Sequence, residues 1–183
     1  MNEQVFVACN EDILWQQVEG DFRKNPDLLE YHAVLQHDSR RVLLDIDIDP
    51  GGGFESGFAT TTFSSYLFDR NNFRFAIHTE NFVDEIGKFF GMKDVILGYK
   101  DFDSKFVVKT NDEAKTVLLF SDAQVRTILL SLPSLTFGIV QYIMEASDGK
   151  APFLELRIEE GITNPAILKK IYHAFYTVLH QLG

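Results

Sequence analysis

The side chains most able to do chemistry stand in one stretch, LLDIDIDPGGGFESG, at residues 43–57. Its acids occupy alternate positions, Asp45, Asp47 and Asp49. Carboxylates at this spacing begin a calcium loop, which also requires glycine at its sixth position and a bidentate glutamate at its twelfth. Counted from Asp45, those positions hold Pro50 and Ser56, so the EF-hand pattern is not met.

The same stretch fits a half-buried strand. Leu44, Ile46 and Ile48 lie between the acids, and a period of two places aliphatic side chains on one face of a strand and acids on the other. We therefore expect the aspartates to face water, with the triple glycine forming a flexible connection. The row would hold Mg²⁺ or Ca²⁺ only if another strand supplied carboxylates. No metal and no other cofactor is expected.

The histidine spacing does not indicate a zinc site. His173 and His180 are seven residues apart on a predicted helix, whereas zinc-binding helices favour histidines four apart with an acid nearby. We expect both on the surface, on the polar side with Lys169. His32 and His37 flank a predicted strand and face opposite sides of it, so they are not a local ligand pair.

Nucleophile and phosphate-binding motifs are also missing. The GFESG segment is not G-x-S-x-G, and no strand leads from it directly into a helix. The glycines of 51–57 lack the lysine of a phosphate loop and a following helix. Cys9 precedes a predicted helix, but its apolar segment VFVAC favours a structural thiol over a nucleophile.

A second acidic segment is YKDFDSKFVVKTND, residues 99–112, where Asp101 and Asp103 bracket Phe102. An acid–base pair would need a partner group, and the sequence identifies none. We expect instead that Phe102 and Phe106 anchor the segment in the core while the aspartates cap and turn the chain.

Sequence periodicity predicts the elements that position these side chains. A first helix is expected over about 11–24, with Asn10 as its cap. Four strands are expected to follow, the first two joined as a hairpin through Asp38 and Ser39. These strands cover residues 29–37, 41–49, 58–68 and 73–79.

The second half is predicted to alternate helices and strands. Caps and breakers predict helices over about 82–90 (Asn81 to Gly91), 112–119 (capped by Asn111) and from Ser121 to about 131. Strands are expected within 94–98 and over 105–110, 135–146 and 152–160. Asn164 followed by Pro165 begins the clearest helix, with Ile167, Ile171, Phe175 and Val178 in one apolar row.

This pattern predicts one α+β domain over residues 1–183. We expect a mainly antiparallel sheet with helices packed on one face and a long C-terminal amphipathic helix. Most of the 17 phenylalanines should lie in the core, where burying each one stabilises the fold by about 2 kcal/mol.

Charge and composition exclude several function classes. The formal net charge of −10 disfavours nucleic acid and anionic membranes as partners. A single cysteine excludes an intrachain disulfide and four-cysteine zinc sites. No apolar run of about 18 residues predicts membrane insertion, and the N-terminus does not match a signal peptide. A cytoplasmic location is therefore expected.

Residues 86–130 resemble a block of uncharacterised bacterial proteins. The shared pattern is Gly-x-x-Asp followed by Phe-Asp-x-x-Phe and an Asn-Asp helix cap. The matching residues are Gly91, Asp94, Phe102, Asp103, Phe106, Asn111 and Asp112. The resemblance implies a bacterial domain of unknown function, and it supplies no catalytic residue.

Three functions remain open from the sequence. The first is a non-enzymatic protein-interaction module that binds an unknown protein partner through a sheet edge or a helix face. The second is a binder of a small apolar molecule or lipid, in a cavity under the C-terminal helix. The third is a carboxylate-dependent hydrolase that uses Asp101, Asp103 or the Asp45–Asp47–Asp49 row with a metal.

Overall fold

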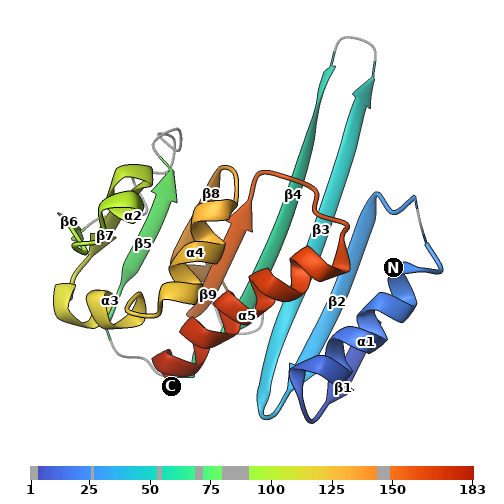
Figure 1. Cartoon of the computed structure of the whole chain (residues 1–183), viewed down its shortest axis with the longest axis horizontal. Helices are drawn as coiled ribbons and strands as arrows, with labels where there is room; N and C mark the ends of the chain where they lie inside the picture. Colours follow the sequence, from blue (N-terminus) through green and yellow to red (C-terminus); the bar gives the residue numbers. More distant parts are fainter. Residues whose placement is uncertain (1–3, 26, 53–54, 69–71, 80–90, 144–148) are drawn as a thin grey trace.

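In the computed structural model, one mixed but mainly antiparallel sheet of nine strands runs across the molecule, with the described helices on one face (Figure 1). The spatial order of the strands is β1-β2-β3-β4-β9-β8-β5-β7-β6. Of the described strands, only β1 pairs in parallel, with β2. The structure describes residues 4–25, 27–52, 55–68, 72–79, 91–143 and 149–183.

The elements follow one another with short connections. The strands are β1 (Gln4–Ala8), β2 (Glu30–His37), β3 (Arg40–Gly52), β4 (Glu55–Tyr66), β5 (Phe75–Thr79), β6 (Lys93–Val95), β7 (Phe106–Thr110), β8 (Leu135–Ile143) and β9 (Lys150–Ile158). The helices are α1 (Glu11–Phe22), α2 (Lys100–Lys105), α3 (Glu113–Leu119), α4 (Ala123–Ser131) and α5 (Pro165–Leu182). The α+β class, the antiparallel sheet and the C-terminal helix are as predicted.

Side-chain caps fix where the helices begin. Asn10 accepts from the Ile13 amide and Asn164 from the Ala166 amide, as the sequence predicts. The caps of α3 and α4 lie one residue later in the sequence than expected, at Asp112 and Asp122. An ionised aspartate oxygen is a strong acceptor for the free amides of a first helical turn. Each aspartate therefore caps its helix in place of the residue before it, Asn111 or Ser121.

The core lies between the sheet and α5. Tyr172 and Phe175 of α5 are fully buried and contact Phe63 of β4, with ring centroids 6.4 and 6.0 Å away. Phe137 of β8 lies 6.0 Å from Phe175 on the other side. Trp15 of α1 meets Tyr172 edge-on at 5.6 Å, which joins the two helices over the sheet.

Two elements were not predicted, and one prediction lies outside the described residues. The sequence patterns indicated no strand at β1 and no helix at α2. The helix expected between Asn81 and Gly91 falls almost wholly on residues outside the described part of the chain. Residues 144–146 of the predicted strand 135–146 are outside it as well, and β8 ends at Ile143.

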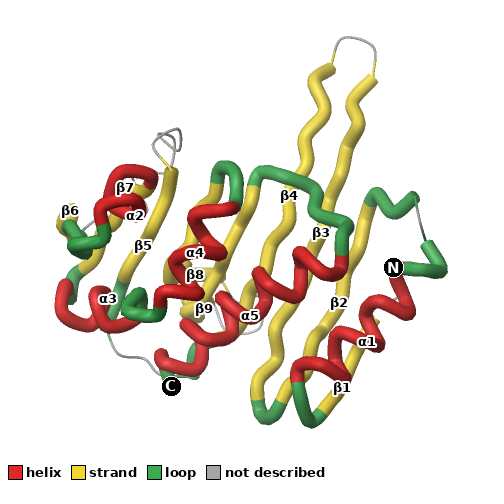
Figure 2. The backbone as a smooth tube through the Cα atoms, in the orientation of Figure 1, coloured by secondary structure: helices red, strands yellow, loops and turns green. Residues whose placement is uncertain are grey.

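Strands β3 and β4 form an arm that projects beyond the rest of the sheet (Figures 1 and 2). β2 accompanies β3 only as far as Asp47, and β9 accompanies β4 only from Thr61. Past those points the two strands pair only with each other, as in Ile48 opposite Ala59 and Asp49 opposite Phe58. We call residues 48–52 and 55–60 the arm.

Proline and glycine shape the arm. The Ile48 amide donates to the Leu29 carbonyl at 2.8 Å, on the β2 side. Backbone groups alternate sides along a strand, so Pro50 takes the next outward position, where it offers no N–H to a further strand. On β4, a Cβ at Gly57 would stand 2.3 Å from the Asp49 carbonyl oxygen, so only glycine allows this close approach.

Among the described residues, no helix combines the length and the apolar character needed to cross a membrane.

Candidate functional site

The candidate site is the face of the sheet on which no described helix packs. We call it the open face. The pairing of neighbouring strands places five polar residues, one from each of five strands, in a single row across this face. In spatial order the row is His32, Asp45, Thr62, Arg157 and Thr136. These side chains belong to the surface of the sheet that the described helices leave uncovered (Figure 1).

The predicted alternation of β3 is confirmed. Leu44 and Ile46 are completely buried toward the helices. Asp45 and Asp47 are half-buried and Asp49 is exposed, all on the open face. The alternation places the aliphatic side chains in the core and leaves the carboxylates at the surface.

The three aspartates have different neighbours. Asp45 lies 2.7 Å from Nδ1 of His32 across the β2–β3 pair. Asp49 accepts a hydrogen bond from the Gly51 amide at 2.8 Å, within the arm. Asp47 lies directly opposite Glu30. Within the described part of the chain, neither Asp47 nor Glu30 forms an ion pair with a lysine or arginine.

Aromatic side chains form a second feature of the open face, at the end of β4 away from the arm. Tyr66 contacts Phe68 at 4.9 Å and Phe153 at 5.6 Å, and Tyr142 contacts Phe153 at 5.2 Å, all edge-on. Phe68 is 70% exposed and Tyr142 is 45% exposed. We call these four residues the aromatic cluster.

Polar groups hold the aromatic cluster in place. The Tyr142 hydroxyl donates to the Glu155 carboxylate. Burial, and then the Glu155 carboxylate, raise the pKa of the Tyr142 phenol, so it stays a hydrogen-bond donor. Arg157, next along this face of β9, pairs with Glu159 at 3.0 Å. Each of these groups has a structural partner within the chain.

Phe58 adds an apolar group on the arm. It lies opposite Asp49, is 52% exposed, and shares the open face with the aspartates. Because the hairpin projects from the sheet, the chain itself offers little apolar surface that could cover this half-exposed ring.

The second acidic segment is structural, as expected. Phe102 is fully buried and contacts Phe106 at 4.8 Å. Asp103 accepts from the amides of Leu97 and Gly98, both at 2.9 Å, and Asp101 is exposed on α2. The structure brings no acid–base partner to these carboxylates among the residues it describes.

Several residues of the block at 86–130 also have structural contacts. Asp94 pairs with Lys109 at 2.5 Å across β6 and β7. Asn111 accepts from the Arg74 amide at 2.8 Å, and Gly91 has a positive φ of 85°. These contacts explain the residue types without assigning them any chemistry.

The histidines are dispersed. His173 lies 3.1 Å from Glu11 between α5 and α1, and His180 is exposed on the last turn of α5. His37 stacks on Tyr176 at 4.8 Å, on the helix side of the sheet, opposite to His32. Cys9 is free and exposed, just before α1. No group of three potential metal ligands occurs among the described residues.

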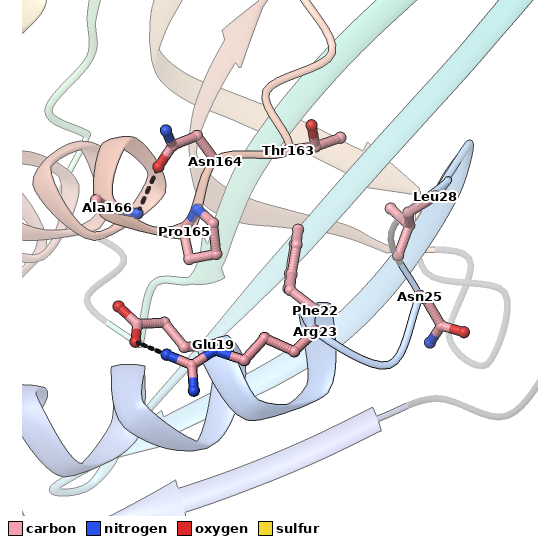
Figure 3. A pocket seen from close by; sticks show the side chains of 9 residues that line it. All are labelled: Glu19, Phe22, Arg23, Asn25, Leu28, Thr163, Asn164, Pro165 and Ala166. Atoms are coloured by element: carbon pink, nitrogen blue, oxygen red, sulfur yellow. Dashed lines mark hydrogen bonds and ion pairs between the residues drawn. The ribbon is translucent and has the colours of Figure 1, made fainter.

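Three of the surface hollows lined by described residues are considered as ligand sites. One of them, of about 370 Å³, lies where the end of α1 meets the start of α5 (Figure 3). Its lining residues are Glu19, Phe22, Arg23, Asn25, Leu28, Thr163, Asn164, Pro165 and Ala166. Arg23 pairs there with Glu19 at 3.6 Å, and Asn164 caps the helix, so these polar groups are already used.

The other two hollows are mainly polar. One of about 340 Å³ is lined by Asp21, Asp27 and Glu30 among others, and the second lies around Arg74. None of the three lies under the middle of α5, where Ile171, Phe175 and Val178 are at most 1% exposed. The cavity predicted under the C-terminal helix is therefore not one of these hollows.

The sequence predicted the acidic row but not the aromatic cluster. Tyr66, Phe68, Tyr142 and Phe153 come from distant parts of the chain, and the pairing of β4 with β9 and of β9 with β8 brings them together. Alternation within a strand predicts which face of the sheet each of these side chains occupies. The order of the strands is also needed to predict that the four side chains are neighbours. Comparison with protein-family models, curated proteins and solved structures gave no significant match to this chain.

Proposed function

We propose that the chain is a non-enzymatic protein-interaction module that binds its partner through the open face of the sheet. The observation that carries this proposal is the exposure of Phe58, Phe68 and Tyr142 on that face. Tyrosine and phenylalanine are enriched at the cores of protein interfaces, where they bury much area at low entropic cost.

The packing of the other face supports the same function. The helix side buries most of its described phenylalanines, as at Phe63, Phe75 and Phe137. A chain that covers its core this well, yet leaves aromatic rings exposed on the opposite side of one sheet, has apolar surface available for association. The rings of the aromatic cluster touch one another, so they form a patch and not scattered single side chains.

The polar groups of the open face favour binding over catalysis. His32 is paired with Asp45, Tyr142 with Glu155, and Arg157 with Glu159. These pairs are spread over strands β2 to β9, whereas an acid–base catalyst requires positioned groups that converge on a reacting atom. Charged and polar pairs around exposed aromatic rings are typical of interface rims.

Site-specific photo-crosslinking tests the proposal. A photo-reactive phenylalanine analogue is placed at position 58 in cells that express the chain natively, and a matched analogue at position 118. Leu118 is 66% exposed on α3, on the helix side. We expect one discrete adduct from position 58 that excess unlabelled protein removes, and no such adduct from position 118. Equal products from both positions, or none from position 58, would contradict the proposal.

A further inference from the structure

We propose that the partner presents a basic, extended segment that lies along the carboxylates of β2 and β3 and covers Phe58. This inference rests on the proposed function and names the chemistry of the partner. The carboxylates form what we call the acidic stripe: Glu30, Asp45, Asp47 and Asp49.

The spacing of the stripe suits an extended segment. Alternate residues of a strand are about 7 Å apart, so Asp45, Asp47 and Asp49 form an evenly spaced row along β3. Lysines or arginines at alternate positions of an extended peptide have the same repeat. A peptide aligned with β3 can therefore place one cation on each carboxylate without bending.

No described lysine or arginine forms an ion pair with the acidic stripe. Among the described residues, its only side-chain partner of this kind is the imidazole of His32, with Nδ1 2.7 Å from Asp45. Asp47 and Glu30 face each other as like charges, an arrangement that destabilises a sheet. On the same face, Arg157 lies beyond Thr62 of β4 and is paired with Glu159. A basic partner would supply the missing cations, and charge complementarity of this kind selects partners and speeds association.

Phe58 adds an apolar anchor at the end of the stripe. It lies opposite Asp49 on the arm, where β3 and β4 have no neighbouring strands. The arm projects past the helix layer (Figure 1), so a segment that runs along β3 from Asp45 onto the open face of the arm meets the carboxylates and the ring together. We expect the partner to place an aliphatic side chain against Phe58, beside its basic residues.

Other occupants fit less well. A divalent cation needs several converging oxygens, and no group of three potential ligands occurs in the described part of the chain. A second copy would bring two surfaces of net charge −10 together, which repel each other. Phosphate groups of nucleic acid or lipid are repelled for the same reason.

Fluorescence anisotropy with a defined probe tests the inference. The probe is a labelled seven-residue peptide of alternating lysine and valine, blocked at both ends. Two control peptides have glutamate in place of lysine, or the same lysines and valines in two separate blocks. The purified full chain is compared with Asp47→Lys and with Asp101→Lys. Asp101 is an exposed acid on α2, so both variants change the net charge equally.

We expect the alternating lysine peptide to bind best, and Asp47→Lys to weaken it at least about tenfold. Asp101→Lys should change the affinity less than about twofold, since the Debye length at physiological salt is about 8 Å. Asp47→Asn provides a milder variant if the lysine disturbs the arm. Equal weakening by both lysine variants, equal binding of the block peptide, or no binding would overturn the inference. Crosslinking from position 58 that survives Asp47→Lys would retain the proposed function and reject the basic partner.

Discussion

Asp47 on β3 lies directly opposite Glu30 on β2, and both carboxylates face the open side of the sheet. Opposed like charges in a cross-strand pair destabilise a sheet by up to about 1 kcal/mol relative to neutral pairs. No lysine or arginine of the described chain neutralises them. The pair therefore marks a position where charge works against folding stability, as is common where a surface is kept for binding.

Replacing Asp47 with lysine should stabilise the fold. The substitution converts a like-charge pair into an opposite-charge pair with Glu30, and we expect the free energy of unfolding to rise by about 0.5 kcal/mol. Urea denaturation at low ionic strength measures the change. Asp101→Lys is the control and should have little effect. A decrease in stability with Asp47→Lys would show that the two carboxylates do not interact as their register indicates.

The glycine of β8 is predicted to be irreplaceable. A Cβ at Gly138 would stand 2.5 Å from the Phe75 carbonyl oxygen and 2.9 Å from Cα of Ala76, both backbone atoms of β5. Gly138→Ala must push two paired strands apart, so we expect a loss of about 2 kcal/mol in the free energy of unfolding.

A second glycine provides the matched control for Gly138→Ala. Gly20 lies within α1, and a Cβ added there would meet no neighbouring heavy atom within 4 Å. Gly20→Ala should stabilise the chain by about 0.5–1 kcal/mol, because alanine loses less backbone entropy in a helix. Chemical denaturation of both variants gives opposite signs if the packing of β8 on β5 is as described. Equal effects would contradict it.

Phe175 should be the most costly truncation of α5. Its ring is fully buried and lies 6.0 Å from both Phe63 and Phe137. Phe175→Ala leaves a cavity between the helix and the sheet, and we expect a loss of about 4 kcal/mol. Ile167, on the same helix, is 44% exposed, and Ile167→Ala should cost much less. A small effect at Phe175, measured by urea denaturation, would contradict the assigned core.

Much of this fold follows from local sequence signals. The alternation in β3, the hairpin through Asp38 and the cap and proline of α5 each depend on residues close in the chain, where pattern and structure are tightly linked. β1 was missed because its five residues, QVFVA, are too few to show a strand period. The six-residue helix α2 was missed because it lacks a side-chain cap.

The candidate site was predictable only in part. The acidic row belongs to one strand, so alternation alone placed it at the surface. The opposition of Asp47 and Glu30 depends on the register between β2 and β3, which the hairpin turn sets. The aromatic cluster depends on β4 lying beside β9, and no local signal specifies that pairing of distant segments. Sequence reasoning therefore found the charges of the open face but not its rings.

The contact between α1 and α5 should depend on pH through Lys169 and Asp12. Nζ of Lys169 lies 2.6 Å from the Asp12 carboxylate. The hydrogen bond and charge of Lys169 lower the pKa of Asp12 below its usual 3.8. A lowered carboxyl pKa stabilises the fold above the unfolded value, and the contribution is lost as the pH falls through the folded value. The difference in unfolding free energy between wild type and Lys169→Met should therefore be larger at pH 6 than at pH 3.

Urea denaturation at both pH values measures this difference, with Lys170→Met as the control. Lys170 is exposed and forms no ion pair in the described structure, so its variant should follow wild type at both pH values. Because both partners are near the surface, added salt should also reduce the contribution of Lys169. A difference that stays constant from pH 6 to pH 3 would mean that the contact of Lys169 with α1 is made by its aliphatic stem and not by its charge.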